Sequence, residues 1–243
     1  MKVLLINGSP RRNGCTFTAL SEVEKTLHRE GIETELVQLG AKAVQGCIAC
    51  GRCKTLGRCV FDDLVNETAP KLEAADGLVV GSPVYYASAN GSLIAFLDRL
   101  FYSTPFDKTM KAGAAVLSCR RGGAAARCVT TARKQSIFTI SGMPVVSSQY
   151  WNSVHGNTPE EVGQDLEGLQ IMRTLGRNMA FLVKKHRARP GEARPARKGA
   201  AHFHEFYPLR PTACAERRFL HAGRSRSARK TAACSPVWSR SAA

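Results

Sequence analysis

Short apolar runs alternate with amphipathic stretches along the first 185 residues, and this alternation constrains the fold more than any other feature. The apolar runs are near-continuous, as in strands buried on both faces of a sheet, and turn residues close each one. The expected strands are residues 2–7, 33–39, 78–81, 113–118 and 143–148, and the expected helices are residues 16–30, 62–75, 93–101, about 124–137 and about 159–184. Strands that alternate with helices predict a parallel sheet covered on both faces, a three-layer α/β sandwich. Five such strands suit the doubly wound order 2-1-3-4-5.

Specific residues mark two of the expected boundaries. Ser82 and Pro83 are expected to break the third strand. Thr158 offers a hydroxyl that can cap a helix, Pro159 suits the first helical position, and two glutamates follow in the first turn. These residues predict the start of one long last helix.

The formal net charge of +16 would suggest a nucleic-acid partner, but its distribution argues against one. Residues 184–243 carry 15 Lys and Arg against 3 Asp and Glu, a net charge of +12, whereas residues 1–183 carry only +4. The basic segment has neither strand nor helix periodicity and contains no recognisable nucleic-acid-binding module. We therefore expect a folded domain over residues 1–185 and a basic tail over residues 186–243 that is disordered or a non-native C-terminus.

The sequence also bears on the compartment. No stretch approaches about 20 apolar residues, so no membrane-spanning helix and no membrane partner are expected. Residues 1–8 are too short for the apolar core of a signal peptide and lead directly into a glycine turn. We expect a cytoplasmic protein, and in that compartment closely spaced cysteines favour metal or redox chemistry over disulfides.

Residues 8–16, which join the first strand to the first helix, have the composition of an anion-binding loop. Two glycines let the backbone approach a ligand closely, and the helix that follows presents free N–H groups at its N-terminus. Ser9 and Thr16 add hydroxyl donors, and Arg11 or Arg12 adds positive charge. The loop matches neither a Walker A sequence nor G-x-G-x-x-G. The composition predicts a bound phosphate, with an ordinary βα turn as the alternative.

Residues 82–86, Ser-Pro-Val-Tyr-Tyr, combine an extended backbone with two aromatic side chains. The carboxyl ends of parallel strands lie at one edge of a doubly wound sheet, and ligands bind there. The loops that contain Ser9, Ser82 and Ser118 should therefore face one ligand. The aromatic loop suits a flat ring, with plain packing of the two tyrosines as the alternative.

The sharpest local signal is a run of four cysteines, Cys47, Cys50, Cys53 and Cys59, within residues 46–60. Four thiolates in one loop can bind a cubane cluster, as in the compact cysteine run of ferredoxins. Zinc also accepts four thiolates, although two separated C-x2-C pairs are more usual. Reduced cysteines that serve as small apolar residues are the third interpretation.

Five motifs of the first 152 residues form a recognisable combination. They are residues 8–11 (Gly-Ser-Pro-Arg), the cysteine run with the Asp-Asp pair that follows it, residues 81–85 (Gly-Ser-Pro-Val-Tyr), residues 118–123 (Ser-Cys-Arg-Arg-Gly-Gly) and residues 143–152 (Met-Pro-Val-Val-Ser-Ser-Gln-Tyr-Trp-Asn). Together they resemble the NADPH-dependent FMN reductase and iron–sulfur flavoprotein family. The resemblance covers about residues 1–185, and the tail departs from it. It implies a flavodoxin-like fold that binds FMN, in a homodimer or homotetramer.

The resemblance also implies roles for individual residues. The FMN phosphate would be bound by Ser9, Arg11, Asn13 and Thr16. The isoalloxazine would be lined by Pro83, Val84 and Tyr85, and its polar edge would be contacted by Ser118, Gly122 and Gly123. The four clustered cysteines match the compact motif that holds a [4Fe–4S] cluster in iron–sulfur flavoproteins.

In such a protein the flavin carries the chemistry and no catalytic side chain is required. The expected function is that of an oxidoreductase that moves electrons from NAD(P)H, with NADPH as the family's donor, to a small acceptor such as a quinone or a free flavin. The alternative is an electron carrier that relays electrons between proteins, with ferredoxin as a partner; nucleic-acid binding by the tail is a third, disfavoured class. His155 is interpreted as a structural or surface residue, and Cys15 and Cys119 as small loop residues.

Overall fold

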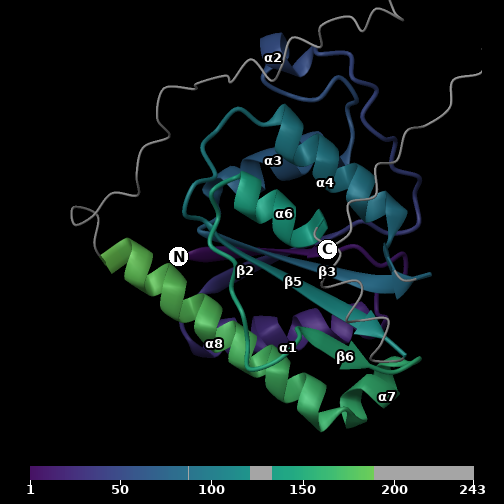
Figure 1. Cartoon of the computed structure of the whole chain (residues 1–243), viewed down its shortest axis with the longest axis vertical. Coiled ribbons are helices and arrows are strands. Elements are labelled where there is room, and N and C mark those ends of the chain that lie inside the picture. Colours follow the sequence, from purple (N-terminus) through teal and green to yellow (C-terminus); the bar gives the residue numbers. More distant parts are fainter. Residues whose placement is uncertain (87, 121–132, 189–243) are drawn as a thin grey trace, which may run out of the picture. The chain divides into compact units, whose positions relative to one another are not determined.

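The computed structural model describes residues 1–86, 88–120 and 133–188, and its elements alternate as predicted (Figure 1). The parallel strands are β1 (Lys2–Asn7), β2 (Glu33–Gln38), β3 (Gly77–Tyr85), β5 (Ala112–Cys119) and β6 (Ser153–His155). They lie in the order β2-β1-β3-β5-β6, and the two-residue strand β4 (Ser88–Ala89) pairs with β3 in the antiparallel direction. Counted as parallel strands along the chain, this is the predicted order 2-1-3-4-5, so the doubly wound topology is confirmed.

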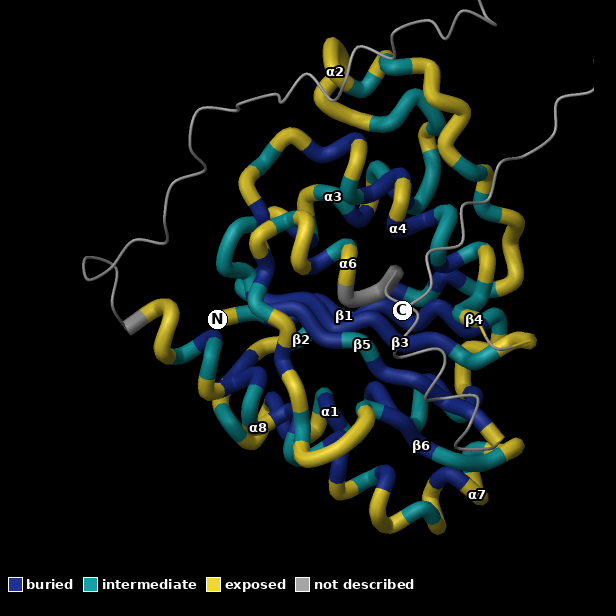
Figure 2. The backbone as a smooth tube through the Cα atoms, in the orientation of Figure 1, coloured by how far each residue is buried: buried dark blue, intermediate teal, exposed yellow. Residues whose placement is uncertain are grey.

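Helices cover both faces of the sheet (Figure 1). One face carries α1 (Cys15–Arg29), α7 (Pro159–Gln164) and α8 (Leu166–Ala188), and the other carries α3 (Leu64–Ala74), α4 (Gly91–Ser103) and α6 (Arg133–Ile140). The short helix α2 (Cys53–Leu56) belongs to the cysteine-rich loop. Figure 2 shows the strands largely buried, whereas the segment around α2 is largely exposed.

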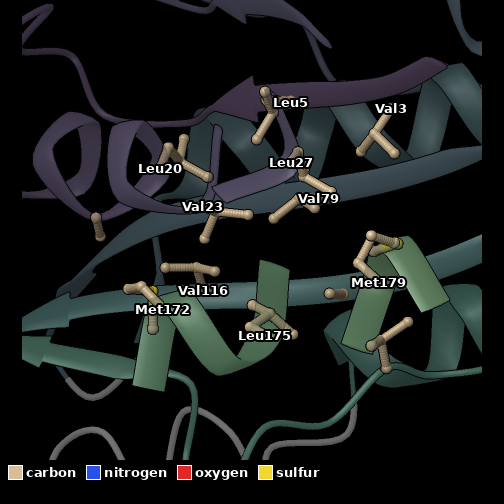
Figure 3. Packing of buried hydrophobic residues seen from close by; sticks show 14 of the residues in the cluster. Val3, Leu5, Leu20, Val23, Leu27, Val79, Val116, Met172, Leu175 and Met179 are labelled. Carbon is tan, nitrogen blue, oxygen red and sulfur yellow. The ribbon is translucent and has the colours of Figure 1, made fainter. Parts of the chain in front are cut away.

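The two cores explain why the strands read as continuous apolar runs. Val3 and Leu5 of β1 belong to the cluster under α1 and α8, whereas Leu4 and Ile6 belong to the cluster under α3 and α4. Successive side chains of a strand point to opposite faces, so a strand between two helical layers needs apolar residues at both parities. Figure 3 shows Leu5 and Val3 among the apolar side chains of the first cluster.

The third strand is longer than predicted. Ser82 and Pro83 do not break it, because β3 continues to Tyr85 and both residues stay paired with β5. The pairing of β3 with β1 ends where Asn7 meets Gly81. Beyond that pair β3 no longer pairs with β1. Pro83, which has no N–H to donate, is therefore tolerated in this part of the strand.

The position predicted for the fifth strand was wrong, because β6 follows the segment 143–148 instead of coinciding with it. Within that segment Val145 makes only an isolated bridge to Gly113, whereas Leu117 pairs with Ser153. Between these two pairs the chain passes eight residues, from Val145 to Ser153, alongside only four residues of β5. The segment from Val145 to Ser153 therefore loops out from the sheet. The segment is apolar because part of it is buried beside the sheet, which periodicity alone cannot distinguish from a paired strand.

The last helix was predicted as one and is two. Thr158 caps α7 as expected, since its hydroxyl accepts a hydrogen bond of 3.3 Å from the backbone N–H of Glu161. The chain leaves the helical conformation at Asp165. The Asp165 carboxylate accepts hydrogen bonds from the backbone N–H of Gly168 at 2.9 Å and of His155 at 2.7 Å. It therefore caps α8 and ties that helix to β6.

Parts of two predictions lie outside the described residues. The helix expected over residues 124–137 is described only from Arg133, where α6 begins. The tail predicted over residues 186–243 is described only as far as residue 188. The domain boundary and the nature of the tail therefore stay predictions. Among the helices of the described segments, none has the length and apolar content that a membrane span requires.

Candidate flavin cleft and cysteine loop

A cleft of about 220 Å³ opens where the parallel strands end. Its lining comes from the loop after β1, the start of α1, the C-terminal ends of β3 and β5, and the residues directly after β5 and β6: Ser9, Arg11, Gly14, Cys15, Thr16, Pro83, Val84, Tyr85, Ser118, Cys119, Arg120, Gly156 and Asn157. Seven residues predicted from the sequence are in this lining: Ser9, Arg11, Thr16, Pro83, Val84, Tyr85 and Ser118. The fold thus brings the three predicted loops to one cleft, as the rule for strand ends requires.

The side chain of Asn7 holds the loop after β1 in shape. Its Oδ1 accepts a hydrogen bond of 3.1 Å from the backbone N–H of Ser9. Its Nδ2 donates to Oε1 of Gln38 in β2 at 2.6 Å and to the carbonyl of Arg12 at 3.4 Å. Gln38 in turn donates to the carbonyl of Ser9 at 2.7 Å. Asn7 is fully buried, so the ends of two strands fix the loop from below.

The N-terminus of α1 faces the cleft without a side-chain cap. Gly14 occupies the N-cap position, and the first turn contains no acidic residue. The backbone N–H of Arg11 donates to Oγ of Ser9 at 3.1 Å. The hydroxyls of Thr16 and Ser118 lie 2.8 Å apart and are buried, which joins α1 to the end of β5. The positive end of the helix dipole, together with hydroxyl donors and an arginine, makes this corner suited to an anion.

Asn90, the N-cap residue of α4, ties the end of β3 to the loop after β1. Its Nδ2 donates to the carbonyl of Gly8 at 2.6 Å, and its backbone N–H donates to Oγ of Ser82 at 3.1 Å. Gly8 also donates from its own N–H to the carbonyl of Gly81 at 2.8 Å. A Cβ at Gly8 would lie 2.9 Å from that carbonyl oxygen, so the close approach of the two loops requires glycine here.

Three predicted cofactor residues are not in the described lining. Asn13 is exposed on the loop beside the cleft and does not line it. Gly122 and Gly123 lie outside the described residues. Their proposed roles, like those of the seven lining residues, remain predictions.

Six lining residues are not among the predicted site residues: Gly14, which the sequence analysis considered only as a glycine of the loop, and Cys15, Cys119, Arg120, Gly156 and Asn157. Gly156 and Asn157 come directly after β6, so the rule for strand ends would have found them had the fifth strand been placed correctly. Burial raises the pKa of the Cys15 thiol, which therefore stays protonated near neutral pH. Its Sγ lies 3.8 Å from the carbonyl of Gly156. Cys15 is thus a neutral lining group and not a thiolate nucleophile.

The four clustered cysteines border a second, much smaller hollow of about 20 Å³. Cys47 and Cys50 are exposed, and Cys53 and Cys59 are half-buried. Within the described segments no three cysteine, histidine or acidic side chains are gathered as a metal ion would require. A hollow of this size holds about one water molecule, so a cubane cluster would require the loop to widen.

The donor chemistry of the hollow nevertheless fits a sulfur-ligated centre. Apart from the four thiols, its lining consists of Ile48, Gly51, Val60, Phe61, Arg99, Tyr102 and Ser103, with no carboxylate or imidazole. Soft thiolate ligands without competing carboxylates favour iron–sulfur clusters or zinc over magnesium or calcium. The backbone of the loop turns through positive φ angles at Gly51 and Gly57, both at 68°.

Comparison with known proteins agrees with this geometry. Residues 1–158 match the family model described as NADPH-dependent FMN reductase. An iron-sulfur flavoprotein of Methanocaldococcus jannaschii is 35% identical over 195 residues, which cover 76% of this chain and 98% of the relative. An iron-sulfur flavoprotein of Methanosarcina thermophila is 30% identical over 197 residues, which cover 77% of this chain and 99% of the relative.

Solved structures share the fold at low sequence identity. The NAD(P)H:quinone oxidoreductase from Methanothermobacter marburgensis superposes with a TM-score of 0.57 at 17% identity and covers 74% of this chain and 96% of its own. A flavodoxin, WrbA-like protein from Agrobacterium tumefaciens gives a TM-score of 0.52 at 14% identity, with 76% and 98% covered. The flavodoxin-like fold predicted from the sequence is therefore confirmed.

Proposed function

Because this chain belongs to the NADPH-dependent FMN reductase family, we propose that it is an FMN-dependent oxidoreductase that moves electrons from NAD(P)H to a small acceptor such as a quinone or a free flavin. The family and the named relatives make it a flavin oxidoreductase or flavin electron carrier. The observation that carries the finer proposal is the cleft at the strand ends, where the uncapped N-terminus of α1 and the end of β3 with Tyr85 line the same space.

The phosphate of FMN would bind at the corner formed by the loop after β1. There the helix terminus offers N–H groups, Ser9 and Thr16 offer hydroxyls, and Arg11 offers charge. Asn13 is exposed close by and belongs to the same proposed set. Because Asn7 and Gln38 hold this corner through hydrogen bonds, its donors are oriented before the phosphate binds.

The isoalloxazine would lie along the C-terminal end of β3. Pro83 and Val84 are half-buried in the cleft wall, and Tyr85 is 48% exposed, which leaves apolar surface for a flat ring to cover. Ser118 would face the polar edge of the ring, together with Gly122 and Gly123.

Among the described lining residues there is no carboxylate, imidazole or amine for proton transfer. Besides two arginines, the titratable groups of that described lining are two cysteines and Tyr85, and the pKa of Cys15 is raised. When bound, FMN would supply the hydride and single-electron chemistry that amino-acid side chains lack. The proposed task of the lining is therefore to bind and orient the flavin and to shield it from water.

A second candidate is an electron carrier that uses FMN together with a [4Fe–4S] cluster and exchanges electrons with ferredoxin. Two observations favour it: all four clustered cysteines border the same hollow, and the relatives matched over nearly their whole length are named iron-sulfur flavoproteins. Cys47, Cys50, Cys53 and Cys59 would be the ligands. Zinc in the same thiols and a metal-free loop are the competing outcomes.

The deciding experiment is anaerobic purification of the full chain, followed by an absorption spectrum, iron and zinc analysis, and titration with FMN. Binding of FMN supports the proposed cofactor, and folded protein that stays colourless and does not bind FMN contradicts it. NADPH oxidation is then measured with a quinone, with free flavin and with ferredoxin as acceptors. Rapid turnover with a small acceptor supports the oxidoreductase, whereas electron transfer to ferredoxin alone supports the carrier. Light scattering on the same sample tests the proposed homodimer or homotetramer.

A further inference from the structure

Arg99 in α4 is the largest fully buried side chain among the described residues, with 1% of its surface exposed. Buried arginines are rare unless they are paired. Its partner is Asp63, and the contact is two-pronged: Nη1 lies 2.7 Å from Oδ2, and Nη2 lies 2.8 Å from Oδ1. Asp63 is also the N-cap residue of α3, so the pair links two helices on this face of the sheet.

The same guanidinium also contacts one cysteine of the cluster motif. Nε and Nη2 of Arg99 each lie 3.3 Å from Sγ of Cys59, so two N–H groups point at one sulfur. The remaining Nη1 contact is with the carbonyl of Gln45 at 3.1 Å, and the ring of Phe61 lies 4.8 Å from the guanidinium carbon. The planar group is therefore fixed on every side and presents a rigid fork to the sulfur.

The backbone of Cys59 is held as well. Nδ2 of Asn66 donates to the Cys59 carbonyl at 3.1 Å, and Oδ1 of Asn66 accepts from the Cys59 N–H at 3.0 Å. Cys47 and Cys50, in contrast, are exposed. Cys59 is thus the member of the motif whose side chain and backbone are both fixed by the folded domain.

We propose that Arg99 is a positioning residue that holds Cys59 as the fixed ligand of the iron–sulfur cluster and raises the reduction potential of that cluster. The proposal rests on the cluster of the proposed function. Hydrogen bonds to ligand sulfurs and nearby charge set the potentials of such clusters, and groups behind the ligands tune them. A reduced cluster carries one more negative charge, so two N–H donors of a cation at one sulfur stabilise the reduced form.

Asp63 makes the proposal testable, because variants at Arg99 and at Asp63 should shift the reduction potential of the cluster in opposite directions. Arg99→Gln removes the cation, whereas Asp63→Asn removes the counter-charge and leaves the guanidinium uncompensated, with an asparagine that can still cap α3. If the Arg99–Asp63 pair served only to hold the helices, both variants would lower stability and neither would move the potential systematically. Arg99→Lys keeps the charge but loses the fork.

The experiment uses the full chain, reconstituted anaerobically with iron and sulfide, and a redox titration that follows the cluster by electron paramagnetic resonance. We expect Arg99→Gln to shift the ratio of reduced to oxidised cluster about tenfold toward the oxidised form, or about 59 mV for a one-electron couple. Asp63→Asn should shift it in the opposite direction, and Arg99→Lys should fall between Arg99→Gln and the unchanged chain. The potential of bound FMN, measured in the same titration, should stay constant.

Equal cluster potentials in the unchanged chain, Arg99→Lys and Asp63→Asn would overturn the assignment. If Arg99→Gln fails to fold, the opposite shifts of the other two variants still support it, and their coincidence with the unchanged chain still overturns it. Loss of iron from Arg99→Gln with an intact circular dichroism spectrum supports the positioning of Cys59. An unchanged chain that binds FMN but no iron overturns the cluster and this assignment together, and leaves the FMN-dependent function standing.

Discussion

The flavin cleft and the cysteine loop are candidate cofactor sites built in different ways. The cleft is assembled from four segments far apart in the sequence. The buried hydroxyl of Thr16 joins the first segment to Ser118 of the third, and the buried Asn7 fixes the first segment to β2. The cysteine loop is one continuous segment around α2 that is largely exposed (Figure 2). Cys59 is its fixed member, because Asn66 and Arg99 hold its backbone and its sulfur. The difference teaches that the fold shapes the flavin cleft before any ligand binds, whereas a metal centre would have to draw the four cysteines of the loop together.

The largest effect is expected from replacement of Cys47, which tests whether the cysteine loop and the flavin cleft are independent sites. Cys47 is exposed, so Cys47→Ser should leave the fold intact. We expect near-complete loss of bound iron, because a cubane loses one of its four thiolates, and less than about a twofold change in the Kd for FMN. Metal analysis and FMN titration measure the two effects, with Cys15→Ser as the control that should retain iron. A parallel fall in FMN affinity would show that the sites are not independent.

The cleft can be tested at the N-cap of α1. Gly14→Asp places a carboxylate where the FMN phosphate is proposed to bind, and Asp is itself a good N-cap. Two like charges about 4 Å apart repel by about 4 kcal/mol at an effective dielectric constant of about 20, and solvent screening lowers this. We expect FMN to bind about 100-fold more weakly than to the matched variant Gly14→Asn, with thermal stability equal or higher.

Both Gly14 variants add a Cβ that would lie 3.1 Å from Cβ of Arg11, so their steric effects cancel in the comparison. Calorimetric titration with FMN measures the difference. Equal affinities of the two variants would mean that the phosphate binds elsewhere.

The buried hydroxyl pair of Thr16 and Ser118 should contribute less. The two oxygens lie 2.8 Å apart and link α1 to β5. Thr16→Val leaves the Ser118 hydroxyl without this partner and should lower the free energy of unfolding by about 1–2 kcal/mol. Urea unfolding of both single variants and of the double variant Thr16→Val/Ser118→Ala gives the coupling energy. A coupling energy near zero would mean that the pair does not stabilise the apoprotein.

The smallest effect is expected away from both sites, at Glu35 in β2. Hydrogen bonds from Lys2 and then Lys71 lower the pKa of Glu35 below its usual value of 4.5. A depressed folded-state pKa stabilises the protein above the pKa of the unfolded chain, and this stability is lost as the pH falls through the lower folded pKa. We expect Glu35→Gln to lose less than about 1 kcal/mol at pH 7 and nothing below that folded pKa. Unfolding curves at both pH values test this, and FMN affinity at pH 7 should not change.

The sequence predicted most of the sheet because its determinants are local. Apolar residues at both parities identify strands between two helical layers, and the strand-end rule then places Ser9, Pro83 and Ser118 at one cleft. The failures depend on contacts between distant segments. Asp165 ends α7 because its carboxylate caps α8 at Gly168, a local signal that the sequence offered, and also accepts from the backbone of His155 in β6, which no local pattern reveals.

Arg99 was missed although the sequence contained a signal. It lies three residues after Phe96 and directly before Leu100, among the mostly apolar buried residues of α4. A single arginine on such a face predicts a buried partner. The partner itself could not be predicted, because Asp63 and Cys59 reach it only through the packing of α3 and its preceding loop against α4.

The hydrogen bonds of Asn7 have a kinetic consequence for cofactor exchange. The turn above β1 adopts its shape when the first two strands pair, through contacts that involve no ligand. The turn therefore loses its conformational entropy during folding, and flavin binding does not have to order it. Flavin uptake should proceed at a rate set by diffusion and by access to the cleft, with no slow step in which this turn becomes ordered. After flavin release the turn should keep its conformation.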